Sequence, residues 1–181
     1  MTKIARFEAF VREFEDMVFA TAVRLLEDPA EAEDVAQTVF LRAYERFDRV
    51  VHNPAAAGWL KTVTTNLCLK HLTRYRSRRR LFSELESPAG AGRASRFADK
   101  IASPESPVAA LEDAERKRRL QHALRRLPAH QRVPLVLFHF DAMSYEQIAA
   151  RLGVSLAKVK SDMHRGRLVL KQALTESHDE I

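Results

Sequence analysis

The stretch SYEQIAARLGVSLAKVKSDMHRGR, residues 144–167, contains two short helical patterns separated by Gly-Val-Ser. Ser144 and Gln147 have the spacing of a capping box, which starts a helix. Gly153 allows a tight turn, and Ser155 can cap the helix that follows. Together these signals predict a helix-turn-helix.

The second helix of this stretch has an apolar side and a basic side. Leu156, Val159, Met163 and Leu170 recur on the apolar side at spacings of three, four and seven. Two neighbouring stripes face outward: Lys160, His164, Arg167 and Lys171 in one, and Lys158, Ser161 and Arg165 in the other. Such a helix fits a DNA major groove, where lysine and arginine side chains contact phosphates and a few side chains reach the edges of the nucleobases. Asp162 stands among these basic residues and would repel phosphate, unless its carboxylate accepts a hydrogen bond from a cytosine amine. A helical hairpin with a solvated basic face is the alternative.

The composition favours an all-α protein with a polyanionic partner. The chain has 181 residues, 46% of them hydrophobic, and only five glycines, and alternating strand patterns are hard to find. The net charge is +6 and the pI about 9.8, which fits nucleic acid or an acidic membrane. The charge is uneven: residues 7–34 are strongly acidic, whereas residues 70–80 contain several bases and no acid.

Other features narrow the class of protein. Cys68 is the only cysteine, so neither a disulfide framework nor a cysteine-based metal site can form within one chain. No stretch approaches the roughly 20 apolar residues of a membrane span, and MTKIARFEAF has no long apolar run typical of a signal peptide. We therefore expect a cytoplasmic protein with no membrane insertion.

Periodicity predicts two small helical domains, residues 1–82 and 111–181, joined by a flexible linker at 83–110. Helices are expected over 7–26, about 30–47, from near Trp59 into the arginine cluster, and over about 111–126. The linker region is rich in Ser, Pro, Ala and Gly without sustained periodicity. The apolar run 133–140 could be a strand, but a buried helix is preferred because Pro128 and Pro134 are tolerable in first turns.

Two predicted helices in the first half each carry a face that is a candidate binding surface. The helix over 30–47 presents an acidic, partly apolar face opposite its core residues, formed by Asp34, Gln37, Thr38, Leu41 and Glu45. This face suits a basic protein partner, although periodicity alone favours an ordinary solvated surface. The helix from Trp59 presents Thr62, Asn66, Lys70 and Thr73 and leads into clustered arginines. Because these bases exceed what a helix C-terminus requires, nucleic acid is favoured here.

Catalytic chemistry has little support in the sequence. No phosphate loop, nucleophile elbow or H-E-x-x-H motif is present, and the histidines show no metal-binding spacing. His139, between Phe138 and Phe140, is interpreted as a core or packing histidine. We expect neither enzymatic activity nor a metal or other cofactor.

Taken together, these residues resemble the extracytoplasmic-function group of bacterial sigma factors. AEDVAQTVFLRAYERF at 32–47 looks like region 2.2 of that family, and residues 124–170 look like its region 4. Two such motifs in the right order, separated by a linker, are more specific than either alone. The resemblance covers about residues 7–80 and 111–174.

The resemblance implies a transcription initiation factor that binds core RNA polymerase, through the β′ coiled coil and the β flap, and directs it to promoter DNA. It assigns the acidic face, Asp34, Gln37, Thr38, Leu41 and Glu45, to the polymerase. It assigns to the −10 element Asn53, Asn66, Lys70, Arg74, Arg76, Arg78 and Arg79, and to a flipped base the loop from Arg49 to Gly58. It assigns to the −35 element Lys158, Lys160, Ser161, His164, Arg165 and Arg167. An anti-sigma partner is also implied.

Two further features concern how the chain would bind a promoter: the reach of the linker and the residues that depart from the family pattern. Two promoter elements about 70 Å apart exceed the relaxed span of the linker, about 25–30 Å, but not its extended reach of about 80 Å. Ala157-Lys158, Gly166 and the alanines at 55–57 depart from the usual residues, so the promoter sequence is not predicted. A free-standing helix-turn-helix regulator and a protein-binding adaptor remain the competing hypotheses.

Overall fold

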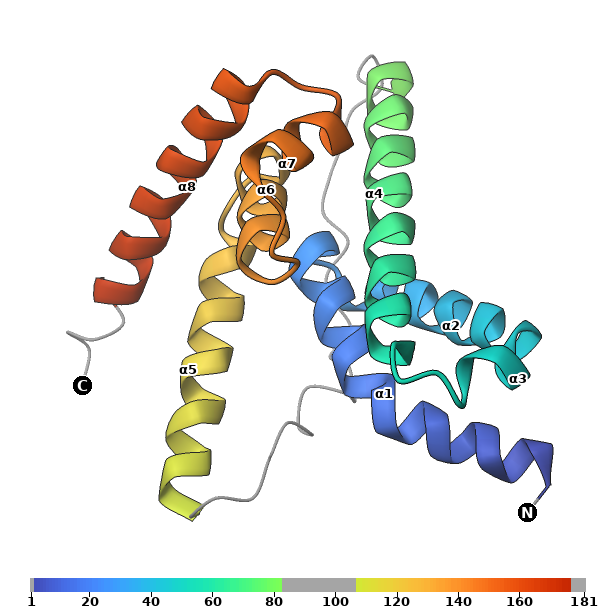
Figure 1. Cartoon of the computed structure of the whole chain (residues 1–181). Helices are drawn as coiled ribbons and strands as arrows, with labels where there is room; N and C mark the ends of the chain where they lie inside the picture. The colour runs from blue at the N-terminus through green and yellow to red at the C-terminus, as the bar shows by residue number, and fades with distance from the viewer. Residues whose placement is uncertain (1, 83–106, 177–181) are drawn as a thin grey trace. The chain divides into compact units, whose positions relative to one another are not determined.

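The computed structural model describes residues 2–82 and 107–176, with side chains described for 2–74 and 114–175 (Figure 1). The described residues are helical and contain no strand, as predicted. The helices are α1 Lys3–Leu26, α2 Pro29–Glu45, α3 Phe47–Val50, α4 Ala56–Phe82, α5 Pro107–Arg125, α6 Ala129–His139, α7 Tyr145–Leu152 and α8 Leu156–Glu176. The chain divides into two compact units, Met1–Ile101 and Ala102–Ile181. The expected linker overlaps α5 at residues 107–110; the rest of it, 83–106, lies outside the described residues.

Side-chain caps fix where the helices of the first unit begin. The Thr2 hydroxyl accepts from the Ala5 amide at 3.3 Å and starts α1, four residues before the expected start. Asp28 accepts from the Ala30 amide at 2.8 Å, and Pro29 occupies the first turn of α2, as the sequence indicated. Between these helices Glu27 adopts a positive φ of 74°, which lets the chain reverse at once.

Three long helices, α1, α2 and α4, pack on one another to form the core of the first unit. Small and β-branched residues line the contacts and allow the helices to approach closely. The fully buried side chains are Val18, Ala22, Leu25, Ala32, Val39, Ala43, Phe47, Leu60, Thr64 and Cys68. The helix expected to run to residue 47 ends at Glu45 and is followed by the short α3, and α4 begins at Ala56 rather than near Trp59.

An aromatic cluster joins the start of α1 to the end of α2 and to α3. The Phe7 ring meets Tyr44 and Phe47 edge-on, with centroids 4.9 Å and 5.3 Å away. Phe10 also meets Phe47 edge-on at 5.8 Å. Edge-to-face pairs of this kind each stabilise a fold by about 0.5–1.5 kcal/mol beyond their buried area. The cluster therefore holds α3, and the loop after it, against α1.

In the second unit α8 packs on α5, α6 and α7. The core combines apolar residues of all four helices and of the turn between α5 and α6: Leu124, Leu127, Leu135, Val136, Leu137, Ile148, Val159 and Met163. Arg132 is buried among them, and its Nη1 donates to the Leu127 carbonyl at 2.8 Å. This hydrogen bond ties α6 to the turn that precedes it.

The apolar run 133–140 lies mostly in α6, so the helical interpretation is confirmed. Pro128 caps α6, but Pro134 lies in its second turn rather than its first and leaves the His130 carbonyl without its usual helical donor. Burial of residues 132–137 compensates for this loss. His139 is not a core residue: it is exposed, and only its edge-on contact with Phe138, at 4.9 Å, matches the packing role.

Within the described ranges, no helix combines the length and the apolar character needed to cross a membrane.

Candidate nucleic-acid and polymerase interfaces

The turn between α7 and α8 has the geometry that the sequence predicted. The Ser144 amide donates to Gln147 Oε1 at 2.8 Å, and the Gln147 amide donates to Ser144 Oγ at 3.2 Å, which completes the capping box. Gly153 ends α7 in the left-handed region, with φ 64° and ψ 38°. Ser155 Oγ then accepts from the Lys158 amide at 3.2 Å and starts α8. These caps orient α8 relative to α7.

The outward side of α8 is polar and solvated. Lys160, Ser161, His164 and Arg165 are all exposed, whereas Val159 and Met163 are fully buried on the opposite side. Leu168, one turn after His164, is exposed on the same outward side. The helix therefore presents a continuous surface to solvent while its opposite side packs against its own unit.

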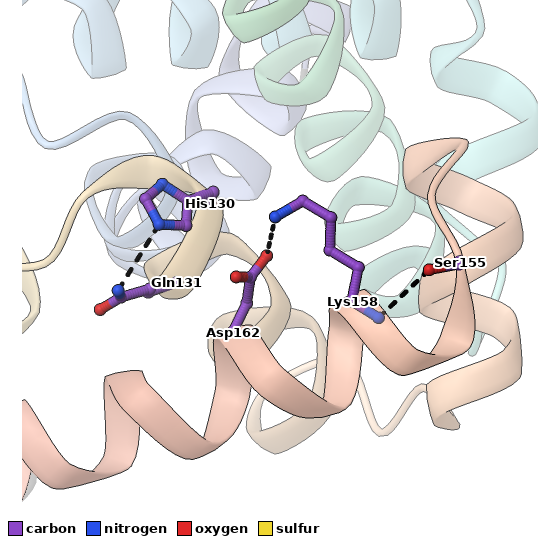
Figure 2. A network of polar contacts seen from close by, with 5 residues as sticks. All are labelled: His130, Gln131, Ser155, Lys158 and Asp162. Carbon is purple, nitrogen blue, oxygen red and sulfur yellow. Dashed lines mark hydrogen bonds and ion pairs between the residues drawn. The ribbon is translucent and has the colours of Figure 1, made fainter.

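Asp162 does not lie on this outward side, contrary to the concern that it would repel phosphate. Its side chain is only 7% exposed, and its Oδ2 accepts from Lys158 Nζ at 2.8 Å. Figure 2 shows the lysine side chain extending along α8, away from Ser155, to reach it. A carboxylate paired in this way neutralises the ammonium group beside it. Lys158, which was expected to contact DNA, thus has a partner inside the unit.

Arg167 also has partners inside the unit. Its Nη2 donates to the Tyr145 hydroxyl at 3.1 Å, and its guanidinium lies 5.6 Å from the centre of the Phe138 ring. These contacts join α8 to α7 and to the end of α6. The same positive charge, after partial burial, lowers the pKa of His139. Sequence reasoning missed this arrangement, because Tyr145 and Phe138 are distant from Arg167 along the chain.

Gly166 allows α8 to approach α6 closely, in addition to lowering the helix propensity of α8. A Cβ built there would lie 2.7 Å from Leu135 Cδ1 and 3.3 Å from Gln131 Cβ. Because Leu135 is buried, it has little room to move away. The helix-propensity cost of glycine, about 1 kcal/mol relative to alanine, is therefore accompanied by a tight contact between α8 and α6.

The candidate −10 surface follows one side of α4. Thr62, Asn66, Lys70 and Arg74 are exposed there at helical spacing, while Thr64 and Cys68 are buried on the other side. The backbone of α4 continues to Phe82 and carries Arg76, Arg78 and Arg79, whose side chains lie outside the described residues. A polar side of this kind suits a single-stranded nucleic acid.

The loop before α4 is shorter than the expected range of 49–58 and spans residues 51–55. Asn53 builds it: its Oδ1 accepts from the Ala55 amide at 2.9 Å, so the Asn-Pro turn is confirmed. Arg6 Nη2 lies 2.8 Å from His52 Nε2, and the Arg6 guanidinium stands over the Phe47 ring at 5.8 Å. The start of α1 thereby supports the loop, a role that sequence reasoning missed.

The acidic face of α2 is present as a surface. Asp34, Gln37, Leu41 and Glu45 are exposed; Thr38 is half-buried, and its hydroxyl donates to the Asp34 carbonyl at 2.9 Å. Leu41 is 67% exposed, and Tyr44, one turn further, is 41% exposed. Sequence reasoning missed Tyr44, although an aromatic residue three positions after an outward leucine is itself a signal.

A polar contact links α2 to the basic side of α4. Glu31 Oε2 lies 3.3 Å from His71 Nδ1, and His71 directly follows Lys70. Partial burial raises the pKa of Glu31, and the His71 charge opposes that shift. The acidic and basic surfaces of the first unit are therefore close neighbours.

Family models match both units. The model described as sigma-70 region 2 matches residues 10–79, and the one described as sigma-70, region 4, matches residues 117–170. These ranges include the α2 face, the side of α4 and the whole helix-turn-helix. The order of the two matches is the order expected from the sequence.

Curated relatives agree over nearly the whole chain. The ECF RNA polymerase sigma factor SigE of Mycolicibacterium smegmatis is 33% identical over 176 residues, which is 96% of this chain and 63% of that protein. The RNA polymerase sigma-E factor of Streptomyces avermitilis is 30% identical over 98% of this chain and 89% of its own length. The ECF RNA polymerase sigma factor SigW of Bacillus subtilis is 29% identical over 94% of this chain and 89% of its own length.

A solved structure has the same fold. It is the sigma factor RpoE in complex with the anti-sigma factor NepR from Bartonella quintana, 24% identical, with a TM-score of 0.50 over 93% of this chain and 96% of that one. With two family models in order and relatives matched along most of their length, the chain belongs to the extracytoplasmic-function RNA polymerase sigma factors, transcription initiation factors that direct the polymerase to promoters.

Proposed function

We propose that this sigma factor docks on core RNA polymerase through the exposed face of α2. The observation that carries this assignment is Leu41, a large apolar side chain left in water between Asp34 and Glu45. Burial of such a side chain within a charged rim is typical of the centre of an interface. The acidic rim suits a basic partner, and the β′ coiled coil is the partner that the family resemblance implies.

Promoter DNA is read by the two remaining surfaces. Asn66, Lys70 and Arg74 of α4, with the arginines that follow them, hold the −10 strand, and the loop built by Asn53 receives an unstacked base. Unstacking a base costs a few kcal/mol, which a preformed pocket offsets. The support for this assignment is the exposure of these side chains on one side of α4, next to a loop that Arg6 and Phe47 hold in place.

The −35 element is read by the outward side of α8. Lys160, Ser161, His164 and Arg165 face away from the core and can enter a major groove. Arg167 supports the helix through Tyr145 and Phe138. The β flap contacts the same unit, as the family resemblance implies.

An anti-sigma factor is part of the proposal. The related sigma factor from Bartonella quintana was solved in complex with one. A regulator that covers Leu41 and the acidic face of α2 would block the polymerase directly. Such a regulator competes with core polymerase for binding, which distinguishes it from one that acts only on DNA.

Two substitutions test the docking face. Leu41→Glu and Asp34→Arg should each weaken binding of the full chain to core polymerase at least about tenfold, as expected for residues at the centre of an interface. Asp16→Arg, on the exposed side of α1, is the matched control. Fluorescence titration of labelled chain with core measures the affinity. Equal affinities of wild type, Leu41→Glu and Asp34→Arg would contradict the α2 assignment.

Run-off transcription tests the whole function. Core enzyme with the added chain should give promoter-specific transcripts that neither component gives alone. Tight binding of the chain to one duplex at physiological salt without core would instead establish a free-standing regulator. If no candidate promoter gives a promoter-specific transcript, the hypothesis of a protein-binding adaptor would be favoured instead.

A further inference from the structure

We infer that Lys158 is the internal counter-ion of Asp162 and not a DNA contact, so that the charge α8 offers to DNA is carried by Lys160 and Arg165 beside His164. This inference rests on the proposed reading of promoter DNA by α8. It removes Lys158 from the residues that were predicted from the sequence to contact the −35 element.

The position of Asp162 on α8 explains why it faces inward. It lies three residues after Val159 and four before Gly166, and those two residues are buried against the unit. At Gly166 the nearest atoms are those of Gln131 and Leu135 of α6. Asp162 is one turn earlier on the same side, which accounts for its 5% exposure as a whole residue.

A carboxylate in that position needs a cation. Burying an unpaired charge is costly, because the loss of hydration is not compensated. Lys158, one turn earlier, meets this need at 2.8 Å with its ammonium group. The lysine itself is still 52% exposed, so its stem covers the surface while its charge is neutralised.

Neutralisation has a measurable consequence for DNA binding. A protein that neutralises Z phosphates releases counterions, and the slope of log K against log salt is about −0.9Z for duplex DNA. A lysine already paired with a carboxylate contributes almost nothing to this slope. An outward lysine such as Lys160, which is exposed on α8, contributes its full share.

Lys158→Gln and Lys160→Gln form a matched pair on one helix. Both variants are assembled with core polymerase, and binding of the holoenzyme to a promoter fragment is measured between 50 and 300 mM salt. Lys160→Gln should reduce the magnitude of the slope by about 0.9, whereas Lys158→Gln should change it by less than about 0.3. Equal reductions by the two variants would overturn the inference.

Asp162→Asn gives the reverse change. The amide frees the Lys158 ammonium, so the slope should steepen by about 0.9 and binding should tighten roughly five- to tenfold near 0.1 M salt. The double variant Lys158→Gln with Asp162→Asn should return to the wild-type slope. An Asp162→Asn slope equal to that of wild type would also overturn the inference. Thermal melting checks that each variant folds. If Lys158→Gln, which leaves the buried Asp162 carboxylate unpaired, does not fold, the double variant replaces it, and a slope reduced as much as in Lys160→Gln would overturn the inference.

The failure of the proposed function is distinguishable. If the wild-type holoenzyme retains no genomic fragment in preference to random DNA, promoter recognition itself fails, and this inference falls with it. If specific complexes form and the two lysine variants behave alike, only the assignment of Lys158 is wrong.

Discussion

α4 and α8 both turn a polar, basic side away from the core of their unit, but they differ in whether those bases have partners within the unit. On α4, Lys70 and Arg74 are exposed, and no acidic side chain of the described residues pairs with either. On α8, Lys158 is paired with Asp162, and Arg167 is held by Tyr145 and Phe138. Two of the bases on α8 therefore have partners within their own unit, and the charge of one of them, Lys158, is neutralised.

The difference follows from the polar residues that each helix buries. α4 packs on α1 and α2, which cover one side of it. α8 packs on three helices, α5, α6 and α7. The packed side of α8 carries a carboxylate, Asp162, whereas the buried polar residues described on α4 are the hydroxyls of Thr64 and Thr65. A buried charged group requires a charged partner. Some basic residues of α8 thereby become structural.

The largest expected effect tests the exposed charge of α4. Lys70→Glu should weaken binding of the holoenzyme to promoter DNA by roughly tenfold or more and reduce the magnitude of the salt slope by at least about 0.9, because one phosphate contact is replaced by repulsion. Arg12→Glu is the control, since Arg12 is exposed on α1 and near Glu8. Filter binding across salt concentrations provides both values. A Lys70→Glu slope equal to the control would show that α4 and α8 do not differ in this way.

An intermediate effect tests the structural bases of α8. Arg167→Ala should destabilise the second unit by about 1–2 kcal/mol, because it removes a hydrogen bond and a cation–π contact. A loss of this size lowers the melting temperature of a small domain by several degrees. Lys160→Ala, one of the outward residues, should leave the melting temperature unchanged and weaken DNA binding instead. Calorimetry of the full chain separates the two outcomes; equal melting temperatures would make Arg167 a surface residue like Lys160.

The smallest effect is a dependence on pH near Arg167. Partial burial, and then the Arg167 charge, lower the pKa of His139 below 6.5 in the folded chain. Between that pKa and 6.5 the unfolded chain binds more protons than the folded chain, so stability is complete above pH 6.5 and declines as the pH falls through the folded value. His139→Gln should remove this slight decline in melting temperature. In Arg167→Ala the pKa of His139, followed by NMR, should rise toward 6.5; a pKa already at or above 6.5 in wild type would refute the account.

Much of the fold could be predicted because its signals are local. The capping box at Ser144 and Gln147, the left-handed Gly153 and the first-turn Pro29 all depend on residues within one turn of the chain. The buried sides of α2 and α8 follow from spacing alone. These features require no knowledge of what packs against each helix.

The fate of individual charges could not be predicted in the same way. Spacing places position 162 on the buried side of α8, but an aspartate there looked like part of a charged surface because its environment depends on α6. Arg167 is stabilised by Phe138 and Tyr145, which no local pattern connects to it. The α2 surface was identified as acidic and partly apolar, yet Tyr44 was missed because it also belongs to the aromatic cluster with Phe7.

The close approach at Gly166 makes the direction of α8 sensitive to a single position. The first turn of α8 lies about ten residues before Gly166, or about 15 Å along the axis. If a larger residue at 166 pushed the axis away from α6 and tilted it by about 10°, the first turn would move by roughly 2–3 Å, comparable to the spacing of successive base pairs, 3.4 Å. Gly166 then acts as a pivot, and substitutions at this position, which is buried against α6, are a route by which related sigma factors could change the promoter they select.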